Sequence, residues 1–574
     1  MKVLLIHPDD DPCRGAWIRQ RWNRAIDLGF AGPETYRMWS ESLGCKVRPL
    51  DAIELEDLKT IRESLFAGLG RMSDRHGLDW WELISLRFHE SLERLLSLQK
   101  WAAAVDSCTG ISSTRCSFDS RAIELLLRRQ VHCFAQTSHR AGLRRSLRAL
   151  SKFRLGEIVQ ILGDKYDADY KVRRLVARAP RKSARPVVLL PSAYVNASRT
   201  ALAYASGLSD RDFLLVTTRE SGRISSRAGN VANAKLSSYA QGRLDEVEYQ
   251  DVLERWRKLE QDLGENWEFS ILRQLGAFTS VPALLREGLA IRDAWLRVFD
   301  CENVSSVLCT DDTNPYTRIP LLLAKNRGIP AISSHHGALD GRYLFKRTHA
   351  DRILAKGRME SDYLTKICGV DREKLAIAAP SRKIATNPLP HFPRDLVVFF
   401  SEPYEIAGGR TVCYYREVLP RLADLAAEYR RELVIKLHPH ESPQERRQMV
   451  NTILSIEQRK TTRLVDGPLH DDLLARTWCA ATVHSTVAVD CTLRGIPVFL
   501  CTWLDHSNYG YVEQFLKFGA GMNLDSANEI AEIPRRLEVF SPKETSCLWE
   551  PATSERLQEL FLQPAAPEPE SISA

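Results

Sequence analysis

Residues 433–441 read LVIKLHPHE, and residues 480–490 read AATVHSTVAVD. Each segment is a short apolar run that ends in polar residues, and a helical pattern follows the second one. Strands buried on both faces have such continuous apolar runs, and they occur in parallel sheets. The two segments therefore predict parallel strands that carry polar side chains at their carboxyl ends.

Further apolar runs recur along the chain, and segments of helical character separate them. This alternation predicts an α/β fold built from repeated strand–helix units. The expected strands lie at residues 2–6, 45–50, 186–190, 213–217, 304–309, 331–334, 352–354, 396–400, 433–437, 463–465, 480–484 and 497–500.

Three prolines within residues 388–393 cannot continue a helix or a central strand, so this stretch predicts a linker between two parallel-sheet domains. Ligands of open parallel sheets bind beyond the carboxyl ends of the strands. The expected organisation is a first domain at 1–388 with helical insertions at about 51–180 and 240–300, a second domain at 389–545, a terminal helix at 546–563 that packs back, and a disordered tail at 564–574.

The composition is that of an ordinary globular protein, with 44% hydrophobic and 27% charged residues. The sequence contains no run of about 18 apolar residues, so we expect no membrane span. The start, MKVLLIHP, has an apolar stretch too short for a secretory signal. Thirteen cysteines without a C-x-x-C pair predict neither a metal site nor a disulfide framework. A reducing cytoplasm is therefore the expected compartment.

The formal net charge is +7, and basic residues concentrate in residues 128–185. This stretch has two interpretations: solvated helix faces, or attraction to an anionic partner such as the inner face of a membrane or a charged glycan. No nucleic-acid motif accompanies the basic residues, so nucleic acid is not an expected partner.

His438 and Pro439 follow the strand that contains Lys436. Proline ends the strand and holds the turn, which places the imidazole at the rim of the sheet. There it can donate a hydrogen bond to a phosphate or a base carbonyl. A purely structural histidine is the alternative.

Ser485 and Thr486 stand where a strand meets a helix. Both residue types are good helix caps, and a helix start beside two hydroxyls can also bind an anion. Asp490, in the first turns of that helix, can accept from ribose hydroxyls. In the first loop of the same domain, Ser401 precedes a Gly-Gly pair and Arg410, which can pair with a phosphate.

VIKLHPHE (434–441) and DLLARTWCAATVHSTVAVDCTLRGIPVFL (472–500) resemble the nucleotide-binding half of GT-B glycosyltransferases. The resemblance is strongest to bacterial capsule-polysaccharide transferases of the Kdo and sialic-acid kind. Those families bind the nucleotide phosphate with an H-P motif and a Ser-Ser or Ser-Thr motif. Related UDP-sugar epimerases and teichoic-acid polymerases share S-x-x-x-x-[ED] before G-x-P, which Ser485, Asp490, Gly495 and Pro497 match here, with aspartate in place of the commoner glutamate. The resemblance implies two Rossmann-like domains that face a cleft.

Two further strand ends supply candidates for the acceptor side. Asp311 and Asp312 follow one strand, either as a base and sugar-binding pair or as an Asx-capped turn. The next strand leads into SSHHGALDG (333–341). Teichoic-type relatives use a strand-end His-Gly as base, and sialyltransferase-like relatives use a carboxylate beside glycine.

This chain has both, in His336-Gly337 and Asp340-Gly341, with His335 adjacent. A neutral imidazole suits deprotonation of a hydroxyl at pH 7, so we favour His336 as the base, with Asp340 as its rival.

The resemblance implies a glycosyltransferase of the cell envelope that moves a sugar from a CMP- or UDP-linked donor to a hydroxyl of a glycan or lipid-linked acceptor. No D-x-D motif stands in a donor-site context, so metal independence is expected, with no cofactor beyond the nucleotide sugar. Alternatives are a nucleotide-sugar epimerase or hydrolase, and a catalytically inactive GT-B binding module of an envelope-glycan assembly. The expected location is cytoplasmic, with peripheral contact at the inner membrane face.

Overall fold

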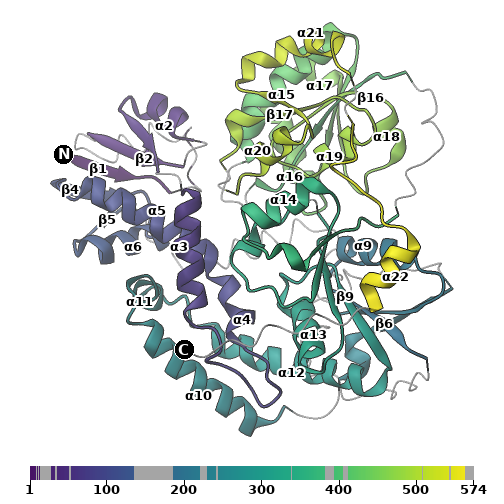
Figure 1. Ribbon diagram of the computed structural model, residues 1–574. Coiled ribbons are helices and arrows are strands. Elements are labelled where there is room, and N and C mark those ends of the chain that lie inside the picture. Colours follow the sequence, from purple (N-terminus) through teal and green to yellow (C-terminus); the bar gives the residue numbers. More distant parts are fainter. Residues whose placement is uncertain are drawn as a thin grey trace. The chain divides into compact units, whose positions relative to one another are not determined.

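The computed structural model describes residues 1–7, 10, 12, 27–32, 35–50, 53–134, 185–219, 229–240, 244–337, 339–381, 393–404, 411–506, 509–541 and 544–562. Within these residues the chain forms three sheets whose strands are all parallel (Figure 1). The predicted α/β fold class is confirmed. The chain divides into two compact units: Met1–Leu58, Ser91–Lys152 and Ile384–Thr545 form one, and Lys59–Glu90, Phe153–Lys383 and Ser546–Ala574 form the other.

The second unit contains a seven-stranded sheet in the order β12-β11-β10-β9-β6-β7-β8. The chain runs outward from β6 to β8, then returns to β9 beside β6 and continues in the other direction. The winding therefore reverses between β6 and β9. The strands are β6 (Val187–Ser192), β7 (Asp212–Thr217), β8 (Val231–Lys235), β9 (Val304–Cys309), β10 (Ala331–Ser334), β11 (Arg352–Ala355) and β12 (Leu375–Ile377).

Helices cover this sheet, and one of them comes from much later in the chain. They are α9 (Val195–Ala205), α13 (Pro315–Asn326), α14 (Arg358–Lys366) and α22 (Ser554–Leu562). The yellow helix α22 lies near α9 in Figure 1, and Leu557, Leu560 and Phe561 join the apolar core under β6 and β9. Gly357 permits the approach of this late segment, because a Cβ there would lie 2.6 Å from the carbonyl oxygen of Cys547.

A helical part of the same unit is built around buried tryptophans and a buried arginine. Its helices include α4 (Trp81–Ile84), α10 (Glu246–Leu263), α11 (Trp267–Gln274) and α12 (Val281–Cys301). Arg292 of α12 is fully buried, and its Nη1 lies 2.6 Å from Asp74 Oδ2 and 2.6 Å from Glu248 Oε1. One guanidinium thus joins α12, α10 and the turn that precedes α4.

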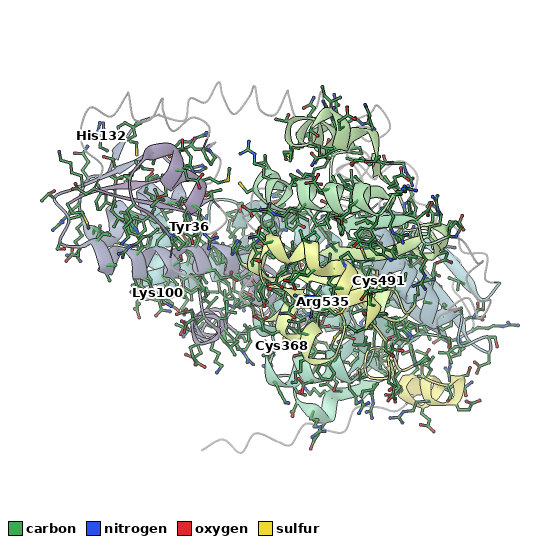
Figure 2. The ribbon with its side chains drawn as sticks, turned by 90° about the horizontal axis from the view of Figure 1, so that it is seen from above. Tyr36, Lys100, His132, Cys368, Cys491 and Arg535 are labelled. Carbon is green, nitrogen blue, oxygen red and sulfur yellow. The ribbon has the colours of Figure 1, made fainter. Side chains whose placement is uncertain are left out.

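The first unit contains a six-stranded sheet in the order β15-β14-β13-β16-β17-β18, and its winding reverses between β13 and β16. The strands are β13 (Leu396–Phe400), β14 (Glu432–Lys436), β15 (Thr462–Val465), β16 (Thr477–Thr482), β17 (Val498–Cys501) and β18 (Met522–Leu524). Its helices are α15 (Thr411–Glu428), α16 (Pro443–Ile453), α17 (Ile456–Lys460), α18 (Asp471–Ala475), α19 (Val487–Thr492), α20 (Tyr511–Lys517) and α21 (Ile533–Glu538). Cys491 of α19, labelled in Figure 2, is fully buried.

The same unit also contains a five-stranded sheet near the start of the chain, in the order β3-β2-β1-β4-β5. Its strands are β1 (Lys2–Leu5), β2 (Leu28–Ala31), β3 (Val47–Pro49), β4 (Gly110–Ser113) and β5 (His132–Cys133), and its helices are α2 (Tyr36–Leu43), α5 (His89–Val105) and α6 (Phe118–Leu127). Helix α3 (Leu55–Phe66) begins in this unit and continues into the other one after Leu58.

This sheet differs from the expectation, because residues 1–388 hold two sheets where we expected one. Strands β4 and β5 lie inside the 51–180 stretch, for which we expected helices. The sequence did not indicate these two strands because both are short and lack an apolar run.

Three features expected from the sequence fall mostly or wholly outside the described residues. They are the proline-rich stretch 386–393, most of the basic stretch 128–185, and the tail 564–574. Among the helices that the structure describes, none combines the length and the apolar character needed to cross a membrane.

Candidate functional site

Tyr194, Asp311, His335, His336 and Asp340 form a polar group at the carboxyl edge of the seven-stranded sheet, and we call it the strand-end cluster. These residues follow β6, β9 and β10, which are neighbours at the point where the winding reverses. Four of them are candidates from the sequence, and Tyr194 is an addition that the structure supplies.

Tyr194 connects the two sides of the reversal point. Its hydroxyl lies 2.8 Å from Nδ1 of His336 and 3.4 Å from Nε2. Burial raises the pKa of Tyr194, and the negative charge of the nearby Asp311 carboxylate raises it further. The phenol therefore keeps its proton at neutral pH.

His335 and Asp340 form a second pair within the strand-end cluster. Nδ1 of His335 accepts a hydrogen bond from the backbone N–H of Gly337 at 3.2 Å, so the neutral ring carries its proton on Nε2. That nitrogen lies 3.5 Å from Asp340 Oδ2. Burial lowers the pKa of His335 well below its usual range and raises the pKa of Asp340 to about 6.

The main chain around this pair is anchored from two directions. Lys356 Nζ donates to the carbonyl oxygens of His335 and Gly337. Cys368, labelled in Figure 2, places its Sγ 3.8 Å from the carbonyl oxygen of Asp340. The loop that carries both histidines is therefore held by side chains that the sequence motifs do not include.

Asp312 has a different environment from Asp311. Its side chain is fully buried, in contact with Lys346 and 4.0 Å from Arg318 Nη1. Burial alone would raise the pKa of Asp312, but the charges of Lys346 and Arg318 outweigh burial and lower it. Arg318 in turn pairs with Glu82 of α4 at 2.8 Å. Asp312 therefore binds two buried cations, and its side chain is not accessible to an acceptor.

Three groups of the strand-end cluster have the ligand types of a metal site. Potential ligand atoms of Asp311, His335 and His336 lie within 4.8 Å of one another. However, a metal-bound His335 would have to lose the Nε2 proton that faces Asp340, while Nδ1 is occupied by the Gly337 N–H. We therefore interpret the cluster as an acid–base group, and metal independence stays a prediction.

A buried glutamate organises the edge of the six-stranded sheet. Glu441 Oε1 accepts from Ser401 Oγ at 2.8 Å and from Arg446 Nε at 2.7 Å, while Oε2 accepts from the backbone N–H of His438 at 2.7 Å. One carboxylate thus brings together the predicted residues Ser401 and His438, which follow the carboxyl ends of the neighbouring strands β13 and β14.

The same turn sets the tautomer of His438. Its Nδ1 accepts from the backbone N–H of His440 at 3.2 Å, so a neutral ring carries its proton on Nε2. Pro439 is exposed at the turn. Lys436 Nζ donates to the carbonyl oxygens of Leu437 and Gly467, at 2.8 and 2.7 Å, and burial lowers its pKa. The Lys436 ammonium group is therefore used to bind the main chain at Leu437 and Gly467.

The segment after β16 runs from strand to helix as predicted, but the helix is short and its first residues are weakly capped. Helix α19 begins directly after Thr486 and has Asp490 in its first turn, but it has only six residues. Ser485 Oγ accepts from the N–H of Val487 at 3.4 Å, and the exposed Thr486 makes no capping bond. A helix this short contributes little partial charge, so an anion here would depend on the hydroxyls and N–H groups. Arg410 lies outside the described residues.

Glu402 and His484 are a pair that the sequence interpretation missed. Glu402 Oε1 accepts from Thr482 Oγ1 and from the His484 N–H, both at 3.1 Å, and Oε2 lies 3.1 Å from His484 Nε2. They flank the reversal point between β13 and β16. Their position beside the predicted Ser401 and Ser485 is the signal that could have found them.

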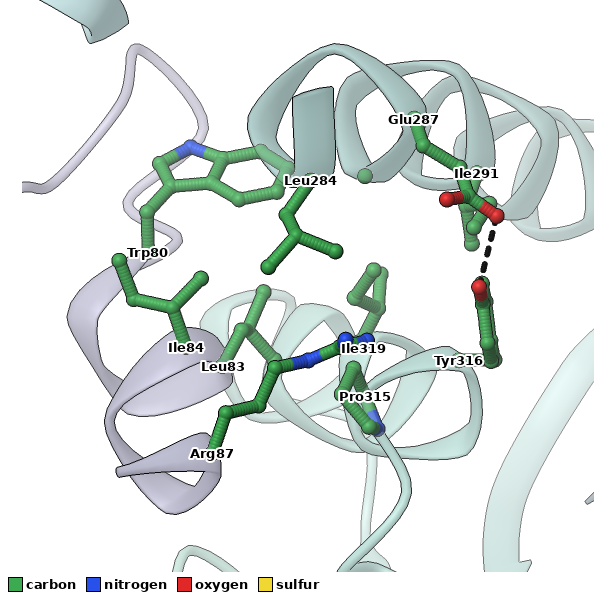
Figure 3. Close-up of a pocket in the computed structure, with 11 residues that line it drawn as sticks. Trp80, Leu83, Ile84, Arg87, Leu284, Glu287, Ile291, Pro315, Tyr316 and Ile319 are labelled. Atoms are coloured by element: carbon green, nitrogen blue, oxygen red, sulfur yellow. Dashed lines mark hydrogen bonds between the residues drawn. The ribbon is translucent and has the colours of Figure 1, made fainter. Parts of the chain in front are cut away.

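A separate hollow lies in the helical part of the second unit, with a volume of about 370 Å³ including space open to solvent (Figure 3). Its wall is mostly apolar, and its polar rim includes a 2.6 Å hydrogen bond from Tyr316 to Glu287. The residues that line it are Trp80, Leu83, Ile84, Arg87, Leu284, Glu287, Gly288, Ile291, Pro315, Tyr316 and Ile319.

No protein-family model and no curated protein matches this chain. Among solved structures, the chain is similar to UDP-GlcNAc 2-epimerase from Methanocaldococcus jannaschii, at 8% identity and a TM-score of 0.43 over 66% of this chain and 99% of that one. It is also similar to the wall teichoic acid polymerase TagF, at 10% identity and 0.36 over 73% and 91%. A glycosyltransferase from Rickettsia africae ESF-5 gives 8% and 0.38 over 67% and 95%. These TM-scores are too low to establish a family or an activity for this chain.

Proposed function

We propose that this chain is a GT-B-type glycosyltransferase that moves a sugar from a CMP- or UDP-linked donor to a hydroxyl of a glycan or lipid-linked acceptor. The observation that carries the proposal is the placement of polar groups where the winding of two parallel sheets reverses. Open α/β sheets bind their ligands at that point. One reversal point presents an acid–base cluster, and the other presents imidazole, hydroxyl and amide groups.

In this proposal the edge of the six-stranded sheet binds the nucleotide. His438, held by Glu441, donates from Nε2 to a phosphate oxygen, and Ser485 and Thr486 contribute hydroxyls. Arg410 adds a cation for the phosphate, and Asp490 accepts from the ribose. Such fixed donors stabilise the charge on the departing phosphate. The proposal includes no metal ion or other cofactor.

The strand-end cluster supplies the base. The acceptor oxygen forms the new bond to the anomeric carbon, its proton goes to the base, and the bond to phosphate breaks with its electron pair on the phosphate oxygen. His336 is the favoured base. Asp340, whose pKa of about 6 leaves it mostly ionised at pH 7, is the rival.

Nucleotide binding is the first test. A thermal-shift screen against CMP, UDP, GDP and CDP should show stabilisation by at least one of them, because a ligand that binds the native state raises its apparent stability. His438→Ala should lower the affinity for that nucleotide about tenfold, because one charge-assisted hydrogen bond is lost. His440→Ala is the matched control, since this exposed neighbour acts on His438 through its backbone N–H. Unchanged affinity in His438→Ala would refute the nucleotide site.

Sugar transfer is the second test. With a donor that binds, His336→Gln should abolish transfer and leave nucleotide affinity unchanged, whereas loss of transfer only in Asp340→Asn would make Asp340 the base. Release of free sugar without an acceptor would identify an epimerase or hydrolase. If the protein binds none of the four nucleotides, a catalytically inactive binding module is favoured.

Membrane contact is a separate part of the proposal, and it depends on the basic stretch 128–185. Co-sedimentation with anionic phospholipid vesicles should fall when these basic residues are neutralised. Equal sedimentation of both proteins would contradict it.

A further inference from the structure

Lys356 directly follows β11, the strand beside β10 in the seven-stranded sheet. We propose that Lys356 is a positioning residue, whose ammonium group binds the main chain on both sides of His336 and holds that imidazole where it can take the acceptor's proton. The role in catalysis rests on the proposed function, whereas the hold on the loop does not.

Three consecutive peptide units around His336 are fixed by hydrogen bonds. The carbonyl oxygens of His335 and Gly337 both accept from Lys356 Nζ. The peptide unit between these two carbonyls contains the N–H of Gly337, which donates to His335 Nδ1 at 3.2 Å. The backbone on both sides of His336 therefore has little freedom to rotate, and one ammonium group fixes two of the three peptide units.

The main chain of Lys356 is held at both of its own polar groups. Its N–H donates to Glu360 Oε2 at 2.5 Å, and its carbonyl oxygen accepts from the N–H of Glu550 at 2.7 Å. Glu360 lies in α14, and Glu550 lies in the late segment that leads into α22. Because the backbone of Lys356 is fixed, its ammonium group can support the loop at a defined place.

Lys356 is too buried to bind a substrate itself. Only 6% of its side chain is exposed, and Nζ lies 3.8 Å from Oε1 of Glu360, which is also buried. Burial raises the pKa of Glu360 to about 7, although the charge of Lys356 opposes this rise. Loss of Lys356 would raise the pKa of Glu360 further, so the carboxyl group would keep its proton at pH 7 and no unpaired charge would be buried.

Hydrogen–deuterium exchange of the full-length protein tests the hold on the loop. Lys356→Met keeps the length of the side chain but removes its donors. Amides of a peptide that contains residues 333–337 should then exchange about tenfold faster, because the loop loses about one net hydrogen bond of local stability. Lys366→Met is the matched control: it removes an exposed lysine of α14, which pairs with Asp362 at 2.6 Å, and should leave this peptide unchanged. Equal exchange in Lys356→Met and the unmodified protein would overturn the proposal.

Kinetics test the role in catalysis. Lys356→Met should lower kcat for sugar transfer by roughly 100-fold, because a small displacement of a reacting group costs about that factor. The affinity for the nucleotide should stay unchanged, since the proposed nucleotide site is in the other unit. Lys356→Arg should recover part of the rate, because a guanidinium also donates to carbonyl oxygens. An unchanged kcat in Lys356→Met, or an equal loss of nucleotide affinity, would refute the positioning role.

A second variant keeps the test decisive if Lys356→Met does not fold. Lys356→Met combined with Glu360→Gln removes the buried carboxyl group together with the ammonium group, so neither charge remains at any pH. The double variant should show the faster exchange and the lower kcat. Glu360→Gln alone should show neither, because it leaves the ammonium group on both carbonyl oxygens. Unchanged exchange and kcat in the folded double variant would overturn the proposal.

The two measurements separate the role of Lys356 from the proposed function. If the unmodified protein transfers no sugar from a donor that it binds, the glycosyltransferase assignment fails, while exchange still shows whether Lys356 holds the loop. If the unmodified protein transfers sugar and Lys356→Met is equally fast, the positioning role fails and the assignment stands.

Discussion

Asp340 is a buried carboxyl group, and its ionisation should be visible in the stability of the protein. Burial raises its pKa from 3.8 to about 6. Between these values the unfolded chain has lost the proton and the folded protein has kept it, so stability falls as pH rises from about 4 to 6. A shift of roughly two pH units corresponds to about 3 kcal/mol at most.

Asp340→Asn should remove this dependence. The unfolding free energy of each protein is measured by urea denaturation at pH 4 and at pH 7. The difference between the variant and the unmodified protein should be more favourable to the variant at pH 7 than at pH 4. An equal difference at the two pH values would show that Asp340 titrates normally. Urea unfolding of Asp312→Asn would not serve as a control, because that carboxylate neutralises Lys346.

Individual residues of the site were predictable where they end strands. His438, Ser485, Asp311 and His336 follow apolar runs that the sequence displays directly. Tyr194 and Glu402 were not assigned, because their importance depends on which strands become neighbours. Tyr194 is 142 positions from His336, and only the adjacency of β6, β9 and β10 brings the two together.

At the scale of elements, α12 contains the clearest stability test. Arg292 is fully buried and is paired with Glu248 and Asp74, which are also buried. Arg292→Met would remove the buried cation from both carboxylates, and Glu248 would keep only the exposed Arg75, whose Nη2 lies 3.0 Å from its Oε2. Removing one partner of a buried pair typically costs about 3–5 kcal/mol, and urea denaturation should show a loss of that size.

Arg286 on the same helix is the matched control. It pairs with Glu246 at 2.7 Å, but 36% and 58% of the two side chains are exposed. Exposed pairs contribute about 1 kcal/mol or less, so Arg286→Ala should change stability little. Similar losses from both variants would mean that burial does not decide the importance of Arg292.

The elements themselves divide into those that the sequence displays and those that it hides. Strands β9, β10 and β13 have the expected bounds, and β13 (LVVFF) is the clearest case because its apolar run is unbroken and fully buried. Strands β4 (GISS) and β8 (VANAK) have few large apolar side chains. Pairing with a neighbouring strand forms them, and local sequence does not reveal pairing.

At the scale of the whole molecule, α22 completes a core that begins hundreds of residues earlier. Leu557, Leu560 and Phe561 are at most 2% exposed, and they pack in the core of the seven-stranded sheet. A chain that ends at residue 552 should therefore unfold at a lower temperature, because three large apolar side chains no longer cover that core.

A chain that ends at residue 562 is the control, since it keeps α22 and loses only residues outside the described part. Thermal unfolding followed by circular dichroism compares the three proteins. If the chain that ends at 552 unfolds at the temperature of the full-length protein, α22 does not contribute to the stability of this unit.

The late arrival of α22 also has a consequence during protein synthesis. The unit with the seven-stranded sheet is assembled from Lys59–Glu90, Phe153–Lys383 and Ser546–Ala574. A ribosome adds roughly 5–20 residues per second, so the last segment follows the second by roughly ten to thirty seconds. In that interval the complete six-stranded sheet emerges, while the surface that α22 covers still faces water. During synthesis the chain thus exposes to chaperones an apolar surface that α22 covers in the finished protein.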